Sequence, residues 1–120
     1  MPIIQVAITK KLSAKEKSDF MEFIAQVICE HTSTLSKNIY VYVQELNHEN
    51  VRKMAPMVLI NWTMMPDRTE PVKKIIMKEI TEKLAEIEPE LKDEIVIIIN
   101  DLPLTSAMLG GETRSENPNK

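Results

Sequence analysis

The side chains that most often carry out chemistry are scarce in this sequence. Cys29 is the only cysteine, so neither a disulfide within the chain nor a cluster of thiolate ligands is available. Its place in the helical pattern VICEH favours a small buried residue over a nucleophile. The two histidines, His31 and His48, have no carboxylate or cysteine partner at the spacing of a metal site. We therefore predict no metal site and look to other residues for chemistry.

The length and charge of the chain exclude several classes of protein. With 120 residues it has room for one ordinary domain. A net charge of −3 gives no general attraction to nucleic-acid phosphates or anionic membranes. No apolar run reaches the roughly 18 residues that span a bilayer, and the start MPIIQVAITKK lacks the pattern of a secretory signal. We expect a cytoplasmic protein that binds neither nucleic acid nor membranes.

An internal repeat organises the sequence. Apolar positions of two predicted helices match at an offset of 56 residues, as Phe20 and Ile76 do, and so do the strands 39–46 and 95–102. At the front of each half the offset is 54 and matches Pro2 with Pro56. We therefore predict a single domain over residues 1–112 made of two repeats, 2–55 and 56–112, followed by a flexible polar tail, 113–120.

Each half is predicted to form a strand, a helix and a second strand. The strands are expected over residues 3–8, 39–44, 57–63 and 94–100. Ser13 and Glu16 fit a capping box at the start of the first helix. In the second half Thr69 can cap the helix, and Pro71 falls in its first turn, where a missing N–H is harmless. The expected apolar stripes are Phe20, Ile24, Val27 and Ile28, then Val72, Ile75, Ile76, Ile80, Leu84 and Ile87.

These elements predict an α+β fold in two layers. A strand, a helix and a parallel strand form a right-handed unit, and two such units give a four-stranded sheet with both helices on one face. Residues 95–99, IVIII, are apolar at every position, which indicates a strand buried on both sides. Because two helices cannot cover the second face, we expect the chain to associate through its sheet.

The chain resembles the tautomerase superfamily. The start Met1-Pro2-Ile3-Ile4-Gln5-Val6, the capped helix and the strand end Gln44-Glu45-Leu46 are similar to 4-oxalocrotonate tautomerase. That subunit is a single β-α-β unit, so this chain resembles the longer members, which include macrophage migration inhibitory factor, malonate semialdehyde decarboxylase and the 3-chloroacrylic acid dehalogenases. The resemblance covers residues 2–112 and includes Leu109-Gly110-Gly111-Glu112 near its end. It implies a trimer of fused chains.

The resemblance implies that Pro2 is the base of a cofactor-independent tautomerase. We expect Met1 to be removed before the small residue proline, which leaves a secondary amine. An α-amino group has a pKa of about 7.7–8.0, and an apolar pocket with nearby cations lowers it, because both disfavour the ammonium form. The neutral amine takes a proton from carbon next to a carbonyl group. Pro56 cannot do this, because its nitrogen is an amide within the chain.

Other residues of the family site are retained only in part. Arg68 matches the second-half loop arginine, which in fused members binds the substrate's carboxylate opposite the proline. Leu12 stands where the first-half loop arginine is expected, and Lys10 or Lys11 could replace it as a point charge. Tyr40 stands at the position of a strand arginine and could donate to a carbonyl oxygen.

Each of these residues also has a purely structural interpretation. Pro2 could simply start a strand, and Arg68 could be an exposed loop residue. Lys10 and Lys11 could be solvated, and Tyr40 could pack at a subunit contact.

Three functions remain open. The first is a tautomerase that acts on a small α-keto acid or its enol, on condition that Met1 is removed. The second is a hydratase, dehalogenase or decarboxylase in which protonated Pro2 is the acid and a separate carboxylate activates water; Asn100 and Asp101 end the last strand and are candidates. The third is a degenerate protein of this fold that binds partners, which the lost arginines favour.

Overall fold

The structure is a computed structural model that describes residues 2–52, 56–64 and 68–118. The main elements are β1 (Ile3–Ile8), α1 (Ala14–His31), β2 (Tyr40–Glu45), β3 (Val58–Met64), α2 (Glu70–Ile87) and β4 (Ile95–Asp101). A short pair of strands, β5 (Met108–Leu109) and β6 (Glu112–Thr113), follows them. Single 3-10 turns lie at Ser36–Asn38, His48–Asn50, Pro89–Leu91 and Leu104–Ser106. Each predicted strand is present, with its ends within one residue of the expected positions.

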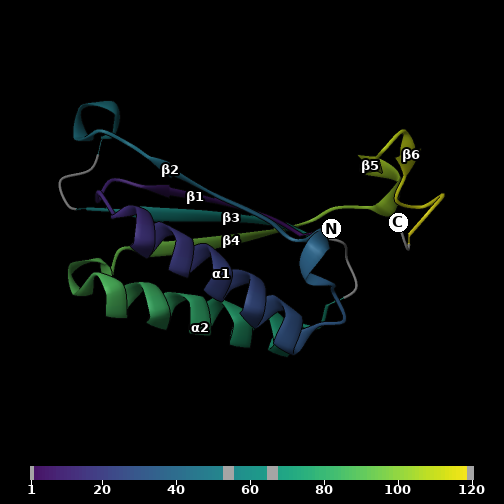
Figure 1. The fold of residues 1–120 in the computed structure, drawn as a ribbon, viewed down its shortest axis with the longest axis horizontal. Helices are drawn as coiled ribbons and strands as arrows, with labels where there is room; N and C mark the ends of the chain where they lie inside the picture. Colours follow the sequence, from purple (N-terminus) through teal and green to yellow (C-terminus); the bar gives the residue numbers. More distant parts are fainter. Residues whose placement is uncertain (1, 53–55, 65–67, 119–120) are drawn as a thin grey trace.

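The four long strands form one sheet in the order β2-β1-β3-β4. β1 pairs in parallel with β2 and β3 pairs in parallel with β4, while the central pair β1 and β3 is antiparallel. Both helices cover the same face of this sheet (Figure 1). The predicted α+β fold of two fused β-α-β units is therefore confirmed. Neither α1 nor α2, the two α-helices of the described ranges, has the length and apolarity that a membrane crossing requires.

The two helices begin differently. At α1 the amide of Glu16 donates to Ser13 Oγ over 3.1 Å, and the Ser13 amide donates to Glu16 Oε1 over 2.9 Å, so the predicted capping box is present. Thr69 occupies the N-cap position of α2, but its side chain makes no capping hydrogen bond. Pro71 lies in the first turn of α2, as expected. The predicted position of the second cap is right and its predicted bond is absent.

The core lies between the helices and the sheet. Equivalent residues of the two halves are buried together, and the buried helix residues are Phe20, Ile24, Val27 and Ile28 in α1 with Ile76, Ile80 and Leu84 in α2. The prediction for Ile75 was wrong, since its side chain is 44% exposed. Successive residues are about 100° apart around a helix, so Ile75 lies beside the stripe that Ile76 continues.

The sheet face away from the helices, here called the open face, is not covered in the single chain. Large side chains remain exposed on its two outer strands: Tyr40, Tyr42, Val96 and Ile98. They alternate with Val41, Val43, Ile97 and Ile99, which pack against the core. Gln5 of β1 donates a hydrogen bond to the Tyr42 hydroxyl across this face. The predicted uncovered face is confirmed.

The C-terminal segment folds back on itself. Gly110 and Gly111 connect β5 to β6 with φ angles of 62° and 87°, a backbone region that favours glycine. Arg114 is buried, and its amide donates to Ala107 O over 2.8 Å. Residues 113–118 therefore belong to this folded segment, where we predicted a flexible tail. The hairpin lies beyond the end of the sheet, on the side of the N-terminus (Figure 1).

Candidate active site

Pro2 lies immediately before β1, one of the two central strands. Its side chain is buried, and its carbonyl oxygen accepts a hydrogen bond of 3.0 Å from the Tyr40 amide. This bond continues the parallel pairing one step beyond the pair Ile3 and Tyr40. Met1 lies outside the described residues. The backbone nitrogen of Pro2 is therefore held at a fixed point at one end of the sheet.

The antiparallel pairing of β1 and β3 brings the loop of the second half to this same end. Ile3 is the register partner of Thr63, so the last residue of β3, Met64, reaches the end of the sheet that holds Pro2. Residues 65–67 lie outside the described residues, and Arg68 follows them. The pairing of the two halves thus brings Met64, four positions before Arg68, to the end of the sheet that holds Pro2.

Arg68 connects two loops at this end. Its side chain is half-buried, and Nη2 donates to Thr34 Oγ1 over 2.8 Å. The amide of Thr34 donates to Thr32 Oγ1 over 3.2 Å, and the Thr32 hydroxyl donates to Ile28 O over 2.6 Å. Through these bonds the guanidinium group is tied to the C-terminal end of α1. This contact argues against a freely solvated loop residue.

Tyr40 contacts Pro2 through its backbone. Its side chain is 43% exposed on the open face, next to Ile3 in the register. Pro2 is buried like Ile4 and Val6, whose side chains face the helices. The ring of Tyr40 and the ring of Pro2 therefore lie on opposite sides of the sheet, a position that suits packing of Tyr40 against another chain.

Lys10 and Lys11 follow the opposite end of β1. Six strand residues at about 3.3 Å each place this end roughly 20 Å from Pro2. Lys10 Nζ lies 2.6 Å from Glu90 Oε1, and the pKa of Lys10 is raised by this hydrogen bond and by the charges of Glu90 and Glu88. Within one chain the structure does not bring either lysine to Pro2.

Leu12, which stands at the matching position of the family's loop arginine, is 3% exposed and belongs to the hydrophobic core.

Asp101 is the carboxylate that the strand register places at the Pro2 end. It ends β4 as the partner of Met64. Lys73 Nζ contacts both of its oxygens, at 3.1 and 2.8 Å. Asn100 lies one residue earlier and is exposed. Lys73 thus holds the Asp101 carboxylate near the end of the sheet, two strands from Pro2.

Sequence reasoning missed Thr34 and Lys73 as partners of the candidate residues. Arg68 and Thr34 are 34 positions apart, and Lys73 and Asp101 are 28 apart. No spacing rule joins residues at such separations, because the contacts depend on how helices and loops pack.

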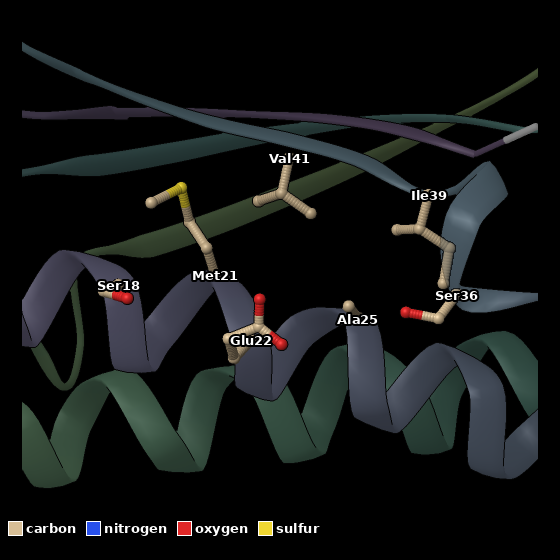
Figure 2. Close-up of a pocket in the computed structure, with 7 residues that line it drawn as sticks. All are labelled: Ser18, Met21, Glu22, Ala25, Ser36, Ile39 and Val41. Atoms are coloured by element: carbon tan, nitrogen blue, oxygen red, sulfur yellow. The ribbon is translucent and has the colours of Figure 1, made fainter.

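A groove between α1 and β2 does not include the predicted site residues. Figure 2 shows Met21 and Val41 facing each other across it, with Ser18, Glu22, Ala25, Ser36 and Ile39 as its other lining residues. Neither Pro2 nor Arg68 lines this groove. Within the described part of the chain, this groove is therefore separate from the predicted site residues Pro2 and Arg68.

Comparison with known proteins identifies the fold. No family model and no curated protein sequence matches the chain. Solved structures match nearly its whole length: the F6 fused 4-OT asymmetric trimer has a TM-score of 0.85 at 18% identity, covering 94% of this chain and 96% of that one. This chain has the fused 4-OT fold.

Two further solved structures are similar to this chain. Pt0534 inactivated by 2-oxo-3-pentynoate has a TM-score of 0.85 at 17% identity, covering 94% of this chain and 97% of that one. FG41 malonate semialdehyde decarboxylase inhibited by 3-bromopropiolate has a TM-score of 0.75 at 15% identity, covering 90% and 88%. These likenesses confirm the fold implied by the resemblance of the sequence.

Proposed function

We propose that this chain is a cofactor-independent tautomerase that moves a proton between carbon and oxygen of a small α-keto acid or its enol. The observation that carries the proposal is the burial of Pro2 next to a central strand, at the end of the sheet that Met64 also reaches, in the fused 4-OT fold. 4-OT is the abbreviation of 4-oxalocrotonate tautomerase, the family that the N-terminal sequence resembles.

Removal of Met1 gives Pro2 its role. The freed secondary amine starts from an α-amino pKa of about 7.7–8.0. Burial of Pro2 disfavours the ammonium form and lowers this pKa. The amine is then neutral near pH 7 and accepts a proton from the carbon next to a keto group. Each chain has one such amine, because Pro56 is internal.

Arg68 is proposed to bind the carboxylate of the substrate. A guanidinium group presents paired N–H donors that match a carboxylate. Its bond from Nη2 to Thr34 Oγ1 orders the side chain before the substrate arrives, which reduces the entropy lost on binding.

Association of three chains is part of the proposal. The open face exposes Tyr40, Tyr42, Val96 and Ile98, and burying such side chains is favourable. Fused 4-OT proteins of this fold have been solved as asymmetric and symmetric trimers. Since Lys10 and Lys11 are far from Pro2 within one chain, either lysine would act only on the Pro2 of another chain.

A second candidate function is hydration or decarboxylation. Asp101, held by Lys73, supplies the carboxylate that hydration needs to activate water, and the likeness to FG41 malonate semialdehyde decarboxylase supports decarboxylation. In this reaction Pro2 acts in its protonated form. As the pH rises and the amine loses its proton, the rate of this reaction would fall, whereas the rate of a tautomerase would rise.

The experiment combines mass and activity. The intact mass should lack one methionine. Conversion of the enols phenylenolpyruvate and 2-hydroxymuconate to their keto forms is then measured for wild type, Pro2→Ala and Arg68→Ala. Pro2→Ala exchanges the rigid secondary amine for a primary amine and should lower the rate, whereas acetylation of the N-terminal amine removes the base and should lower it by about 10²–10⁴-fold. Pro56→Ala and Arg52→Ala are the matched controls and should keep the wild-type rate; a retained Met1 or an unchanged rate after acetylation of the N-terminal amine would reject the proposal.

A further inference from the structure

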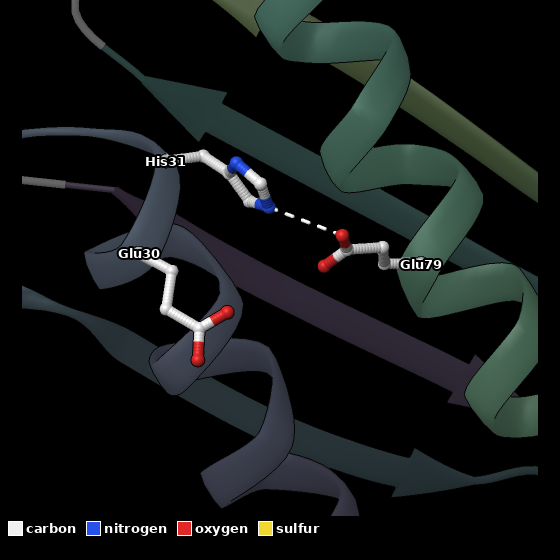
Figure 3. Close-up of side chains that lie close together, drawn as sticks. All are labelled: Glu30, His31 and Glu79. Atoms are coloured by element: carbon white, nitrogen blue, oxygen red, sulfur yellow. Dashed lines mark hydrogen bonds and ion pairs between the residues drawn. The ribbon is translucent and has the colours of Figure 1, made fainter.

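A histidine and two carboxylates meet where the two helices pack together. His31 Nε2 lies 3.1 Å from Glu79 Oε1, and one ligand atom each of Glu30, His31 and Glu79 lies within 4.8 Å of the others. Glu30 and His31 are the last two residues of α1, and Glu79 lies in the middle of α2. Figure 3 shows His31 pointing directly at Glu79 between the helices, with the Glu30 carboxylate beside them.

The spacing of these atoms fits a shared cation. In a tetrahedral zinc site with bonds of about 2.0–2.1 Å, neighbouring donor atoms are about 3.3 Å apart. The His31–Glu79 separation of 3.1 Å is close to this value. The Glu30 side chain is exposed, so it has the freedom to move its carboxylate into the same shell.

The ligand atoms of these three residues indicate which class of metal ion they would bind. An imidazole nitrogen with carboxylate oxygens suits zinc and similar transition-metal ions, whereas magnesium and calcium prefer oxygen ligands alone. Three protein ligands leave a fourth position for water. The side chains of His31 and Glu79 are 28% and 37% exposed, so an ion can reach them from solvent.

We propose that Glu30, His31 and Glu79 form a surface zinc site that joins α1 to α2. The site shares no residue with the candidate active site of Pro2 and Arg68. It also lies in the helix layer, on the other side of the sheet from the open face, so association through that face leaves it accessible. Because the ligands come from both helices, the bound ion favours the folded state over the unfolded chain.

The sequence alone did not indicate this zinc site. His31 has no carboxylate partner at metal-site spacing within its own half, and for this reason we predicted no metal site. Glu79 is 48 positions away and belongs to the second half. The packing of α1 on α2 supplies the missing ligand.

The test uses the full chain without a histidine tag, freed of metal by a chelator. Zinc chloride is titrated into wild type and into His31→Gln, Glu79→Gln and Glu30→Gln, with calorimetry and thermal unfolding as readouts. Wild type should bind one zinc per chain and unfold at a higher temperature with zinc than without. Removing a residue that only hydrogen-bonds to a metal ligand weakens metal binding by about 10–100-fold. Removing a direct ligand, His31 or Glu79, should therefore weaken zinc binding by at least about tenfold.

Matched controls separate this site from general surface binding. His48→Gln and Glu49→Gln change exposed residues outside α1 and α2 and should bind zinc like wild type. Glu30→Gln alters an exposed side chain, so its folded state should be intact and its zinc affinity reduced. Absence of zinc binding by wild type, or equal affinity of wild type, His31→Gln and Glu30→Gln, would overturn the proposal.

Discussion

Arg68 Nη2 donates a 2.8 Å hydrogen bond to Thr34 Oγ1, and this bond joins the loop before α2 to the segment that leads into β2. The two residues come from different halves of the repeat. Their contact therefore holds Arg68, just before α2, against the segment that leads into β2. If Arg68 binds the carboxylate of a substrate, Thr34 is the residue that positions it.

Replacing Thr34 should weaken the proposed activity without unfolding the chain. Thr34→Val keeps the shape of the side chain but removes the acceptor. Hydrogen bonds to charged groups contribute about 1.5–3 kcal/mol, so kcat/KM for enol-to-keto conversion should fall about tenfold, mainly through KM. Thr34→Ser should restore the rate and Thr105→Val, at an exposed threonine, should not change it; a wild-type KM in Thr34→Val would show that this bond does not position Arg68.

The repeat predicts matched losses of stability in the two helices. Ile24 and Ile80 are equivalent positions of α1 and α2, and both are at most 1% exposed. Each change to alanine removes buried methyl and methylene groups and should lower the free energy of unfolding by about 2–5 kcal/mol. Ile75→Ala, at a side chain that is 44% exposed, should change it by less than about 0.5 kcal/mol. Denaturant unfolding measures all three; a large loss for Ile75→Ala would contradict the described packing of α2.

The helix starts should respond unequally to the loss of a cap. Ser13→Ala removes both bonds of the capping box and should lower the free energy of unfolding by about 1 kcal/mol. Thr69→Ala removes a side chain that makes no capping bond, so it should have little effect. Urea unfolding at equal protein concentration compares them, and equal losses would show that Thr69 caps α2 in solution.

The open face should mediate association. Ile98→Lys places a charge on the β4 side of this face, where Ile98 is 45% exposed in the single chain. Burying an unpaired charge is unfavourable, so the variant should shift the proposed trimer towards monomers in light scattering after gel filtration. Ile75→Lys introduces the same charge on α2 and should leave the trimer intact. A monomeric wild type would reject association through the sheet.

Much of the fold was predictable because it is encoded by local patterns. The capping box of Ser13 and Glu16, the apolar spacing of α1 and the alternation of Val41 with Tyr40 and Tyr42 all act over a few residues. The failures concern interactions that local patterns do not determine. Ile75 is apolar yet lies beside the buried stripe, and Arg114 is polar yet buried in the C-terminal segment.

The candidate site was predictable only in part, for a related reason. Pro2 and Arg68 follow from the resemblance, and the antiparallel pairing of β1 and β3 brings their segments to one end of the sheet. That same pairing separates Lys10 and Lys11 from Pro2 within the chain. The partners Thr34 and Glu79 come from the packing of one half on the other, which no motif in either half records.

The central claim is that the freed amine of Pro2 acts as a base, and the pH dependence of kcat/KM tests it most directly. Protein from which Met1 has been removed, as shown by its intact mass, is assayed for ketonisation of phenylenolpyruvate between about pH 5 and pH 9. The proposal predicts that kcat/KM rises with pH to a plateau, with a midpoint below about 7.7, and that acetylation of the Pro2 amine abolishes this activity. A rate that falls as the amine deprotonates would favour the acid role, and a rate independent of both pH and Pro2 would contradict the proposed function.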